Sequence, residues 1–319
     1  MSKVHAAILD DYQHVAEGLL GSRTVPDGLQ ITVFHDHLTD EDALAGRLRE
    51  FEAVCVMRER TPFRRGLLER LPNLRLLVTS GMRNASIDMA AAGERGVTVC
   101  GTPSVGGPTA ELAWGLIIGL LRHIPREDRA TRAGAWQETV GGGLLGKTLG
   151  VAGLGKLGAR VARVGLAFEM DVIAWSRNLT EERCREVGVT RVSQEELLSR
   201  SDILTIHLVL SDRTRGLLGA AELATMKPAA VLINTSRGPI VDQDALVDAL
   251  ERGVIAGAGL DVYDTEPLPL DHPLRRCRNT IITPHLGYVE EANYGAYFDG
   301  YLAAMRGYLD GAPVNVIKG

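Results

Sequence analysis

Short apolar runs alternate with amphipathic segments along almost the whole chain, a pattern typical of parallel sheets covered by helices. Residues 1–100 contain five such runs, each short enough for one buried strand, with helical spacing of apolar residues between them. The runs are 4–9, 29–34, 53–57, 74–78 and 97–99. Thr39 with Asp42 has the spacing of a helix cap before the third run. These elements predict a small parallel α/β domain.

A second series of apolar runs begins at residue 148 and predicts a second α/β domain. Its runs are 148–152, 171–175, 203–208, 230–234, 256–260 and 281–282. Ser193 with Glu196, and Asp242 separately, are placed to cap two of the intervening helices. Residues 292–309 have the pattern of a long helix that leads back to the first domain.

The two series predict an inserted domain. Residues 103–287 are expected to form a Rossmann dinucleotide-binding domain within a flavodoxin-like substrate domain made of residues 1–102 and 288–319, both with doubly wound parallel sheets. Between the two series, residues 109–124 are strongly apolar and predict one helix ended by Pro125. A helix this apolar is expected to be buried, either between domains or in a subunit interface.

Three glycines follow the first strand of the second series at the spacing of a dinucleotide fingerprint. Gly153 permits a tight turn, Gly155 lets the backbone approach a pyrophosphate, and Gly158 lets the next helix pack closely on the strand. Lys156 and Leu157 begin that helix, whose N–H groups and dipole favour phosphate. The layout of strand, glycine turn, helix and strand therefore predicts nucleotide binding; a purely structural turn is the alternative.

Composition and charge narrow the functional classes. With 319 residues, 45% of them hydrophobic and 24% charged, the chain has ordinary globular values and room for two domains. A formal net charge of −5 gives no basic field for nucleic acid or a membrane surface. Cys55, Cys100, Cys184 and Cys277 form no CxxC pair, so no metal site is predicted and a reducing cytoplasm fits best. No membrane span or leader is predicted, given the early acidic pair at 10–11.

Two loops of the first domain follow strands at the edge where parallel sheets bind ligands. One contains Arg60, and the other contains Ser80 and Gly81, whose backbone N–H groups suit a carboxylate. These three residues are predicted to bind the substrate. The alternatives are a solvated arginine and an ordinary turn.

Three charged residues lie in loops after strands of the second domain, where they are expected to reach one crevice. Arg237 is suited to bidentate binding of a carboxylate. His285 can exchange a proton with a hydroxyl or carbonyl oxygen near neutral pH. A buried Glu266 beside it would fix its tautomer and favour its protonated form. Each residue alone also fits an ordinary loop position, and only their shared placement favours catalysis.

The segments 226–242, 259–267 and 283–287, in this order after the glycine turn, resemble the D-isomer-specific 2-hydroxyacid dehydrogenase family. The resemblance covers essentially the whole chain. It implies two domains with a cleft that closes about a hinge, and NAD(P)-dependent hydride transfer between a small 2-keto acid and its D-2-hydroxy acid. It also implies that Arg237 binds the substrate carboxylate and carbonyl, and that His285 is the acid/base with Glu266 as its partner.

The resemblance further implies cofactor contacts and an assembly. Asp261 matches the position that holds the nicotinamide carboxamide, Thr109 lies where the family's linker helix meets the cofactor, and His207 lies near the adenosine pocket. The remaining expected contacts in the matching motifs are Thr235 and Gly287. Because the family dimerises through this helix and the arm after it, a homodimer through residues 109–146 is expected.

The chain departs from the residues that are usual in the family at three places. NAD-specific members end the second strand with an aspartate for the ribose hydroxyls, whereas this chain has Ser176 and Arg177, and its Asp171 begins the strand. A hydroxyl and a guanidinium suit a 2′-phosphate, so NADP(H) is favoured over NAD(H); a solvated arginine is the alternative. The substrate loop 81–88 is also unusual, and Glu169 stands where a helix-ending glycine is common.

Two other functions fit the same resemblance. A formate-type dehydrogenase pairs its histidine with glutamine, so Glu266 argues against that function. A nucleotide-sensing scaffold without turnover is the second, and no recruitment segment in the sequence supports it.

Overall fold

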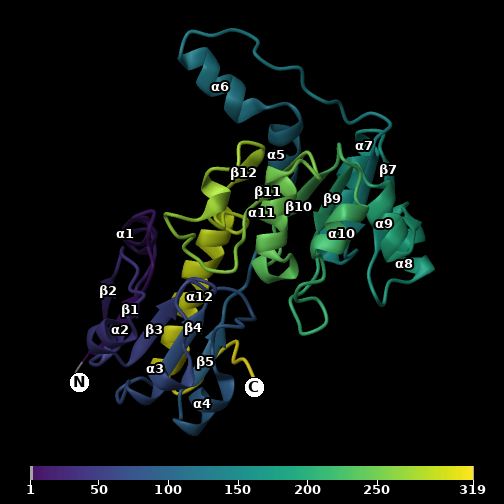
Figure 1. Ribbon diagram of the computed structural model, residues 1–319. Helices are drawn as coiled ribbons and strands as arrows, with labels where there is room; N and C mark the ends of the chain where they lie inside the picture. Colours follow the sequence, from purple (N-terminus) through teal and green to yellow (C-terminus); the bar gives the residue numbers. More distant parts are fainter. Residues whose placement is uncertain (1–2, 319) are drawn as a thin grey trace. The chain divides into compact units, whose positions relative to one another are not determined.

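A computed structural model describes residues 3–318 and divides them into two compact units. The first unit comprises the chain up to Val105 and from Glu291 onward, and the second is Gly106–Glu290. In Figure 1 the purple and blue N-terminal part and the yellow C-terminal helix belong to the first unit, and the teal and green part to the second. The chain therefore leaves the first unit once and returns to it once.

The first unit has a five-stranded parallel sheet in the order β2-β1-β3-β4-β5, the flavodoxin-like order. Its strands are β1 (Val4–Ile8), β2 (Leu29–Val33), β3 (Ala53–Val56), β4 (Leu76–Thr79) and β5 (Thr98–Gly101). Its helices are α1 (Ala16–Gly21), α2 (Glu41–Leu48), α3 (Arg65–Glu69), α4 (Met89–Glu94) and α12 (Glu291–Leu309). Every residue of β3 and β4 is buried, because helices cover both faces of a central parallel strand.

The second unit has a seven-stranded parallel sheet in the order β12-β11-β10-β9-β6-β7-β8, a Rossmann order that reverses at β6. Its strands are β6 (Thr148–Ala152), β7 (Asp171–Trp175), β8 (Thr190–Arg191), β9 (Ile203–Ile206), β10 (Val231–Asn234), β11 (Gly257–Leu260) and β12 (Thr280–Ile282). Its helices are α5 (Pro108–Leu121), α6 (Ile124–Arg132), α7 (Lys156–Ala167), α8 (Glu181–Val187), α9 (Gln194–Arg200), α10 (Ala220–Thr225) and α11 (Gln243–Glu251), with short 3₁₀ turns at Gly238–Ile240 and Pro273–Arg275. The predicted fold of two parallel-sheet α/β domains is confirmed.

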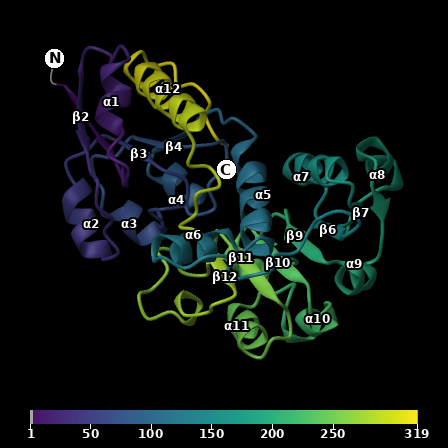
Figure 2. The ribbon, with the colours of Figure 1, turned by 90° about the horizontal axis from the view of Figure 1, so that it is seen from above.

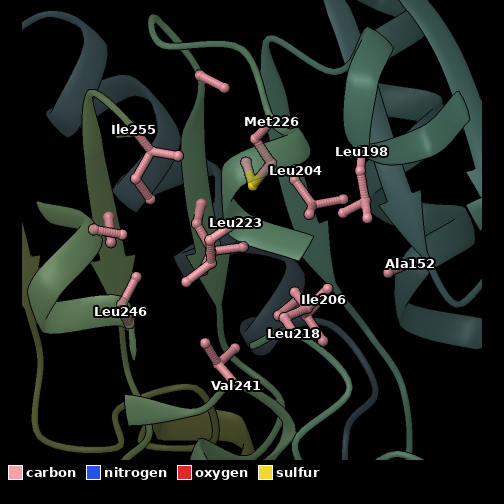
Figure 3. Close-up of a cluster of buried hydrophobic side chains, with 14 of the residues drawn as sticks. Ala152, Leu198, Leu204, Ile206, Leu218, Leu223, Met226, Val241, Leu246 and Ile255 are labelled. Atoms are coloured by element: carbon pink, nitrogen blue, oxygen red, sulfur yellow. The ribbon is translucent and has the colours of Figure 1, made fainter. Parts of the chain in front are cut away.

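Two apolar cores lie on the two faces of the second unit's sheet. One is built from α5, α7 and α8 against the sheet and includes Trp114, Val161 and Cys184. The other is built from α9, α10 and α11 and includes Leu223 and Leu246. Figure 2 shows the two sets of helices on opposite sides of this sheet, and Figure 3 shows the second core at close range. Both faces are thereby covered, and the loops at the strand ends remain to form a site.

Two expectations for the helices need correction. Asp40, not Thr39, caps α2, since its carboxylate accepts a hydrogen bond from Ala43 N at 2.8 Å. The predicted helix 109–124 ends at Leu121, and Pro125 lies in the first turn of the separate helix α6, where its missing N–H costs nothing.

The apolar helix α5 packs on its own unit's sheet with one face, on which Ala113, Leu116 and Ile117 are buried. It contacts β10, β11 and β12 and lies against α7. Gly119 and Gly259 make close approaches possible there, since a Cβ on either would lie 3.0 Å from a neighbouring side-chain atom. Burial inside the Rossmann domain accounts for this face, while Leu112, Ile118 and Leu121 are half-buried, so a subunit contact of the helix stays a prediction.

Glu169 follows α7 with φ at +57°, so a glutamate occupies the left-handed position where the sequence analysis noted that glycine is common. Among residues 3–318, no helix combines the length and apolar character that a membrane crossing needs.

Candidate functional site

The glycine turn after β6 has the geometry that a dinucleotide-binding turn needs. Gly153 has φ at +100°, and a Cβ there would lie 2.7 Å from the backbone oxygen of His207. A Cβ on Gly158 would lie 2.0 Å from the backbone oxygen of Gly153, so this glycine lets α7 pack directly on the turn. Around Gly155, by contrast, a Cβ would meet no atom within 4 Å. The chain is therefore tight where it packs on itself and open where a pyrophosphate would approach.

The N-terminus of α7 faces this open position. Gly155 is its N-cap and supplies no side-chain acceptor, so the first N–H groups of the helix keep their capacity to bind an anion. Lys156 is exposed at the first helical position, and Leu157 is half-buried beside it. Arg183 Nε donates to Leu154 O at 3.2 Å and thereby ties α8 to the turn.

The residues after β7 lie next to the glycine turn, because Gly153 N donates to Trp175 O at 2.8 Å. Ser176 is half-buried and Arg177 is exposed. Asp171 is exposed at the opposite end of the strand, as predicted. No carboxylate therefore stands at the position where a ribose would need one, and a hydroxyl and a guanidinium stand there instead.

Asp261, Thr109 and Gly287 are brought together at the carboxyl end of β11. The fully buried carboxylate of Asp261 accepts from Leu286 N at 2.7 Å and from Gly287 N at 2.8 Å. Thr109 Oγ1 donates to Gly287 O at 2.7 Å. Burial raises the pKa of Asp261, although these hydrogen bonds oppose the change. Both carboxylate oxygens thus already bind protein N–H groups, which the sequence did not reveal.

Two further expected cofactor residues have polar groups at the strand ends. The Oγ1 atom of Thr235, just after β10, is buried and has no hydrogen-bond partner among the described residues. An orphaned buried hydroxyl of this kind is what a bound polar group would satisfy. His207 follows β9, and its Nε2 lies 3.0 Å from Thr205 Oγ1. Burial lowers the pKa of His207 to about 4, so its imidazole is neutral at physiological pH.

His285 and Glu266 form a close pair. Nδ1 of His285 lies 2.6 Å from Oε2 of Glu266, and Oε1 of Glu266 accepts from Tyr263 N at 2.9 Å. The side chain of Glu266 is 34% exposed and that of His285 is 19% exposed, so the expectation of a buried glutamate is wrong. The carboxylate is oriented by a backbone N–H and by the histidine while it stays in contact with solvent.

The histidine is also held by its own backbone and by an aromatic neighbour. His285 has φ at +54°, a conformation that non-glycine residues rarely adopt and that is often found at functional sites. The ring of Tyr288 lies edge-on to the imidazole, with centroids 5.3 Å apart and planes at 72°. Tyr288 was not predicted to be part of the site, since an aromatic residue three positions after a histidine carries no signal of its own.

Arg237 comes just after one of three adjacent strands, and Glu266 and His285 come after the other two. It follows β10, Glu266 follows β11 and His285 follows β12, and these three strands are neighbours in the sheet. Its Nη1 donates to Ser236 O at 2.7 Å, and its own carbonyl accepts from Asn234 Nδ2 at 3.0 Å. The topology therefore brings the three predicted residues to one edge of one sheet, and a side-chain contact joins two of them, His285 and Glu266.

The predicted loops of the first unit use their polar groups internally. Ser80 N donates to Val56 O at 3.1 Å, and Gly81 N donates to Thr102 Oγ1 at 2.9 Å. Each of these N–H groups therefore has an acceptor within the first unit, which a carboxylate would have to replace. Arg58 Nη1 approaches so closely that a Cβ on Gly81 would lie 2.2 Å from it. Binding of substrate by Ser80 and Gly81 stays a prediction.

Arg60 is anchored to the segment after β1. Its Nη1 donates to Asp10 O at 2.6 Å, and its guanidinium lies 4.4 Å from the centre of the Tyr12 ring. Neither Asp10 nor Tyr12 was singled out from the sequence, because their contacts join segments about fifty residues apart. Among the described residues, no cluster of three or more potential metal ligands occurs.

Comparison with known proteins agrees with this geometry. Residues 114–287 match the model of the D-isomer specific 2-hydroxyacid dehydrogenase family, NAD binding domain. A glyoxylate reductase from Aeropyrum pernix is 43% identical over 229 residues, 69% of this chain and 68% of that protein. A hydroxypyruvate reductase from Blautia hydrogenotrophica is 31% identical over 88% of this chain and 89% of its own.

A solved structure matches nearly the whole chain. The crystal structure of a phosphoglycerate oxidoreductase from Vibrio cholerae superposes with a TM-score of 0.93 at 37% identity, covering 98% of this chain and 100% of the other. The similarity therefore extends over both units.

Proposed function

Because the chain belongs to the D-isomer-specific 2-hydroxyacid dehydrogenase family, we propose that it reduces a small 2-keto acid to the D-2-hydroxy acid with a nicotinamide dinucleotide. The observation that carries the proposal is the 2.6 Å contact between His285 Nδ1 and Glu266 Oε2, on the sheet edge that also carries Arg237. An acid/base, its carboxylate partner and a carboxylate-binding guanidinium are the groups that this reaction needs.

The residues present fit a dinucleotide. The open position at Gly155 and the uncapped N-terminus of α7 suit a pyrophosphate, and the unpartnered Oγ1 of Thr235 suits a polar group of the cofactor. Asp261, with Thr109 and Gly287, would shape the floor under the nicotinamide rather than offer a free carboxylate. When bound, the nicotinamide would supply the hydride.

The protein's part in the reaction is to position the acid and to move a proton. Arg237 would bind the carboxylate and polarise the carbonyl oxygen, on which negative charge develops. Since Nδ1 of His285 is held by Glu266, Nε2 is the ring nitrogen left to donate a proton to that oxygen. Glu266 would orient the imidazole through Nδ1, and the left-handed backbone of His285 would fix where Nε2 lies.

We favour NADP(H) over NAD(H) as the cofactor. The support is the exposed Arg177 beside the half-buried Ser176 at the end of β7, with Asp171 remote at the other end of the strand. A carboxylate at the end of β7 would repel a 2′-phosphate, whereas a guanidinium attracts it.

The proposed assembly is a homodimer through residues 109–146. Helix α5 would contribute half-buried side chains such as Leu112 and Ile118 to the contact. The rest would come from α6 and the segment after it, which Figure 1 shows extending away from the sheet of that unit. Helix α6 has no buried residue, and Trp136 is 78% exposed, Val140 96% and Leu145 74%. Large apolar side chains at this exposure mark a surface that another chain covers, and a second copy of the same arm is the proposed partner. A cytoplasmic location likewise stays a prediction.

The function is tested with glyoxylate, hydroxypyruvate, 3-phosphohydroxypyruvate and pyruvate, each with NADPH and with NADH. Reduction of at least one acid is expected, and His285→Ala should lower kcat by about 10²–10⁴-fold while nucleotide binding is kept. Tight nucleotide binding with no turnover on any acid would favour a nucleotide-sensing scaffold instead. Oxidation of formate would favour the formate-type alternative, against which the His285–Glu266 contact argues.

A further inference from the structure

Tyr263 lies between the loops that carry the three predicted catalytic residues. It follows β11, which is the middle one of the three adjacent strands, β10, β11 and β12, that precede those residues. Its side chain is 6% exposed and packs in the core that α9, α10 and α11 form with the sheet. A buried tyrosine in this place has the loops of two neighbouring strands within its reach.

The hydroxyl of Tyr263 braces the turn that presents His285. It lies 2.9 Å from Thr283 O and 3.1 Å from Leu260 O, and its single proton is shared between these two carbonyls. His285 N donates to the same Thr283 O at 3.0 Å and closes the tight turn in which His285 has φ at +54°. The phenol therefore binds the carbonyl on which the histidine's own turn closes.

The backbone of Tyr263 contacts the other two loops. Its N–H donates to Oε1 of Glu266 at 2.9 Å. On the opposite side lies Gly238, the residue after Arg237, and a Cβ there would lie 2.1 Å from the carbonyl carbon of Tyr263 and 2.3 Å from its oxygen. Side chain, N–H and carbonyl of one residue thus each contact a different one of the three loops.

The phenol is held as a neutral hydrogen-bond donor. Burial, together with the nearby carboxylates of Asp261 and Glu266, raises the pKa of Tyr263, so its hydroxyl keeps its proton at neutral pH. That proton is directed at backbone carbonyls. The hydroxyl is therefore placed to act through the loops it holds rather than as an acid towards a bound molecule.

We propose that Tyr263 is a positioning residue for the reaction, whose hydroxyl holds His285 in register with Glu266. The proposal rests on the proposed function and adds a residue to it. Tyr263 orients both members of the pair, Glu266 through its N–H and His285 through the Thr283 carbonyl. Without the hydroxyl the turn can relax, and a small displacement of a proton donor lowers the rate of reaction far more than it weakens binding.

The first test is Tyr263→Phe, which removes the hydroxyl and keeps the ring and the core volume. With the acid that the unmodified protein reduces fastest, kcat should fall by about ten-fold or more, the scale of a lost hydrogen bond and a misplaced acid. KM for the acid and the affinity for nucleotide should stay close to those of the unmodified protein.

Ser201→Ala is the matched control. Ser201 is also fully buried and its hydroxyl also donates to a backbone carbonyl, that of Leu197. It lies just before β9, at the edge of the same sheet opposite to the catalytic loops. This variant should be destabilised to urea to a similar degree while its kcat is kept.

The second test needs no turnover. Long-range ¹H–¹⁵N NMR of histidine-labelled protein shows which ring nitrogen carries the proton in the neutral imidazole, and His285→Ala identifies the signals of His285. In the unmodified protein the proton should be on Nδ1, which faces Glu266. In Tyr263→Phe part of the population should carry it on Nε2 instead, and Ser201→Ala should match the unmodified protein.

The other outcomes count against the proposal. An unchanged kcat or an unchanged proton position in Tyr263→Phe overturns it. An equal loss of kcat in Ser201→Ala, or a loss of nucleotide affinity as large as the loss of kcat, also overturns it, because either would reflect general loosening of the unit. If the unmodified protein reduces none of the acids, the proposed function fails, and the NMR comparison still decides whether Tyr263 holds the histidine.

Discussion

The two oxygens of Glu266 bind different partners, the imidazole Nδ1 of His285 at 2.6 Å and the backbone N–H of Tyr263 at 2.9 Å. The carboxylate therefore has a fixed orientation and presents its charge to the histidine. Because this contact holds Nδ1 and leaves Nε2 to donate the proton, Glu266→Gln should lower kcat for reduction by about ten-fold or more while nucleotide affinity is kept. Stopped-flow reduction and nucleotide titration measure the two quantities separately. An unchanged kcat in the Glu266→Gln protein would mean that the pair does not act together in catalysis.

The preference for NADPH should depend on Arg177. Arg177→Ala is expected to shrink the difference in binding free energy between NADPH and NADH by about 1–3 kcal/mol, the scale of a charge-assisted contact. Ser176→Asp should reverse the preference, since a carboxylate repels the 2′-phosphate and accepts from a free ribose hydroxyl. Fluorescence titration with both nucleotides measures this directly. Equal affinities in the unmodified protein would contradict the assignment of NADP(H).

Alanine at two glycines of the turn should affect different properties of the protein, stability in one case and nucleotide affinity in the other. Gly158→Ala places a Cβ 2.0 Å from Gly153 O and should lower the free energy of unfolding by about 1–3 kcal/mol, through overpacking. Gly155→Ala meets no protein atom within 4 Å, so stability should be kept while nucleotide affinity falls. Urea unfolding and nucleotide titration separate the two. The assignment fails if Gly155→Ala binds nucleotide normally.

Acid should destabilise the fold through His207. Its pKa in the folded protein is about 4, whereas an unfolded histidine has the ordinary value of about 6.5. As pH falls below about 6.5 the unfolded chain takes up a proton that the folded protein does not, so stability is lost progressively down to about pH 4. By pH 5 the loss should be about 2 kcal/mol.

The histidine-to-glutamine variant isolates this contribution. Between pH 7.5 and pH 5, His207→Gln should lose about 2 kcal/mol less unfolding free energy than the unmodified protein. His5→Gln, at an exposed position, is the matched control and should follow the unmodified protein. Identical pH dependence in all three proteins would show that His207 is not held neutral.

We expect the arm, which consists of α6 and the segment up to residue 146, to hold two copies of the chain together as a dimer. Trp136→Asp is expected to raise the dimer dissociation constant by at least about ten-fold, because a charge replaces a large aromatic side chain that is 78% exposed in the single chain. Leu270→Asp is the matched control, since Leu270 is 90% exposed outside the arm. Light scattering across a dilution series gives the mass. A monomer mass for the unmodified protein at micromolar concentration would refute the dimer.

The sequence was most informative where function depends on local backbone geometry. The spacing of Gly153, Gly155 and Gly158 predicted a turn that is closed at two positions and open at the third, because the constraint lies within six residues. The order of the motifs likewise placed Glu266 and His285 after neighbouring strands, since consecutive strands of a Rossmann half are adjacent in space.

The sequence was least informative where a polar group is satisfied by a distant segment. No residue close to Gly81 in the sequence indicates that its N–H donates to Thr102 Oγ1. Likewise, no residue close to Asp261 in the sequence indicates that both of its carboxylate oxygens accept hydrogen bonds from the loop after β12. The stacking of Tyr12 on Arg60 joins two loops that become neighbours only when β1 and β3 pair. Such contacts are set by the register of the sheet, which apolar periodicity predicts only coarsely.

The insertion of one unit in the other has a consequence for synthesis on the ribosome. Helix α12 packs on β4 and β5, and Tyr301 on this helix donates its hydroxyl to Val56 O at 2.9 Å, so this part of the first sheet is covered only when residues 291–309 have been made. At about 5–20 residues per second, residues 106–290 take roughly 10–40 s to translate. During that interval the nascent first sheet waits with an uncovered apolar face, open to chaperones. The Rossmann unit, contiguous in the chain, is therefore free to fold before the unit that encloses it.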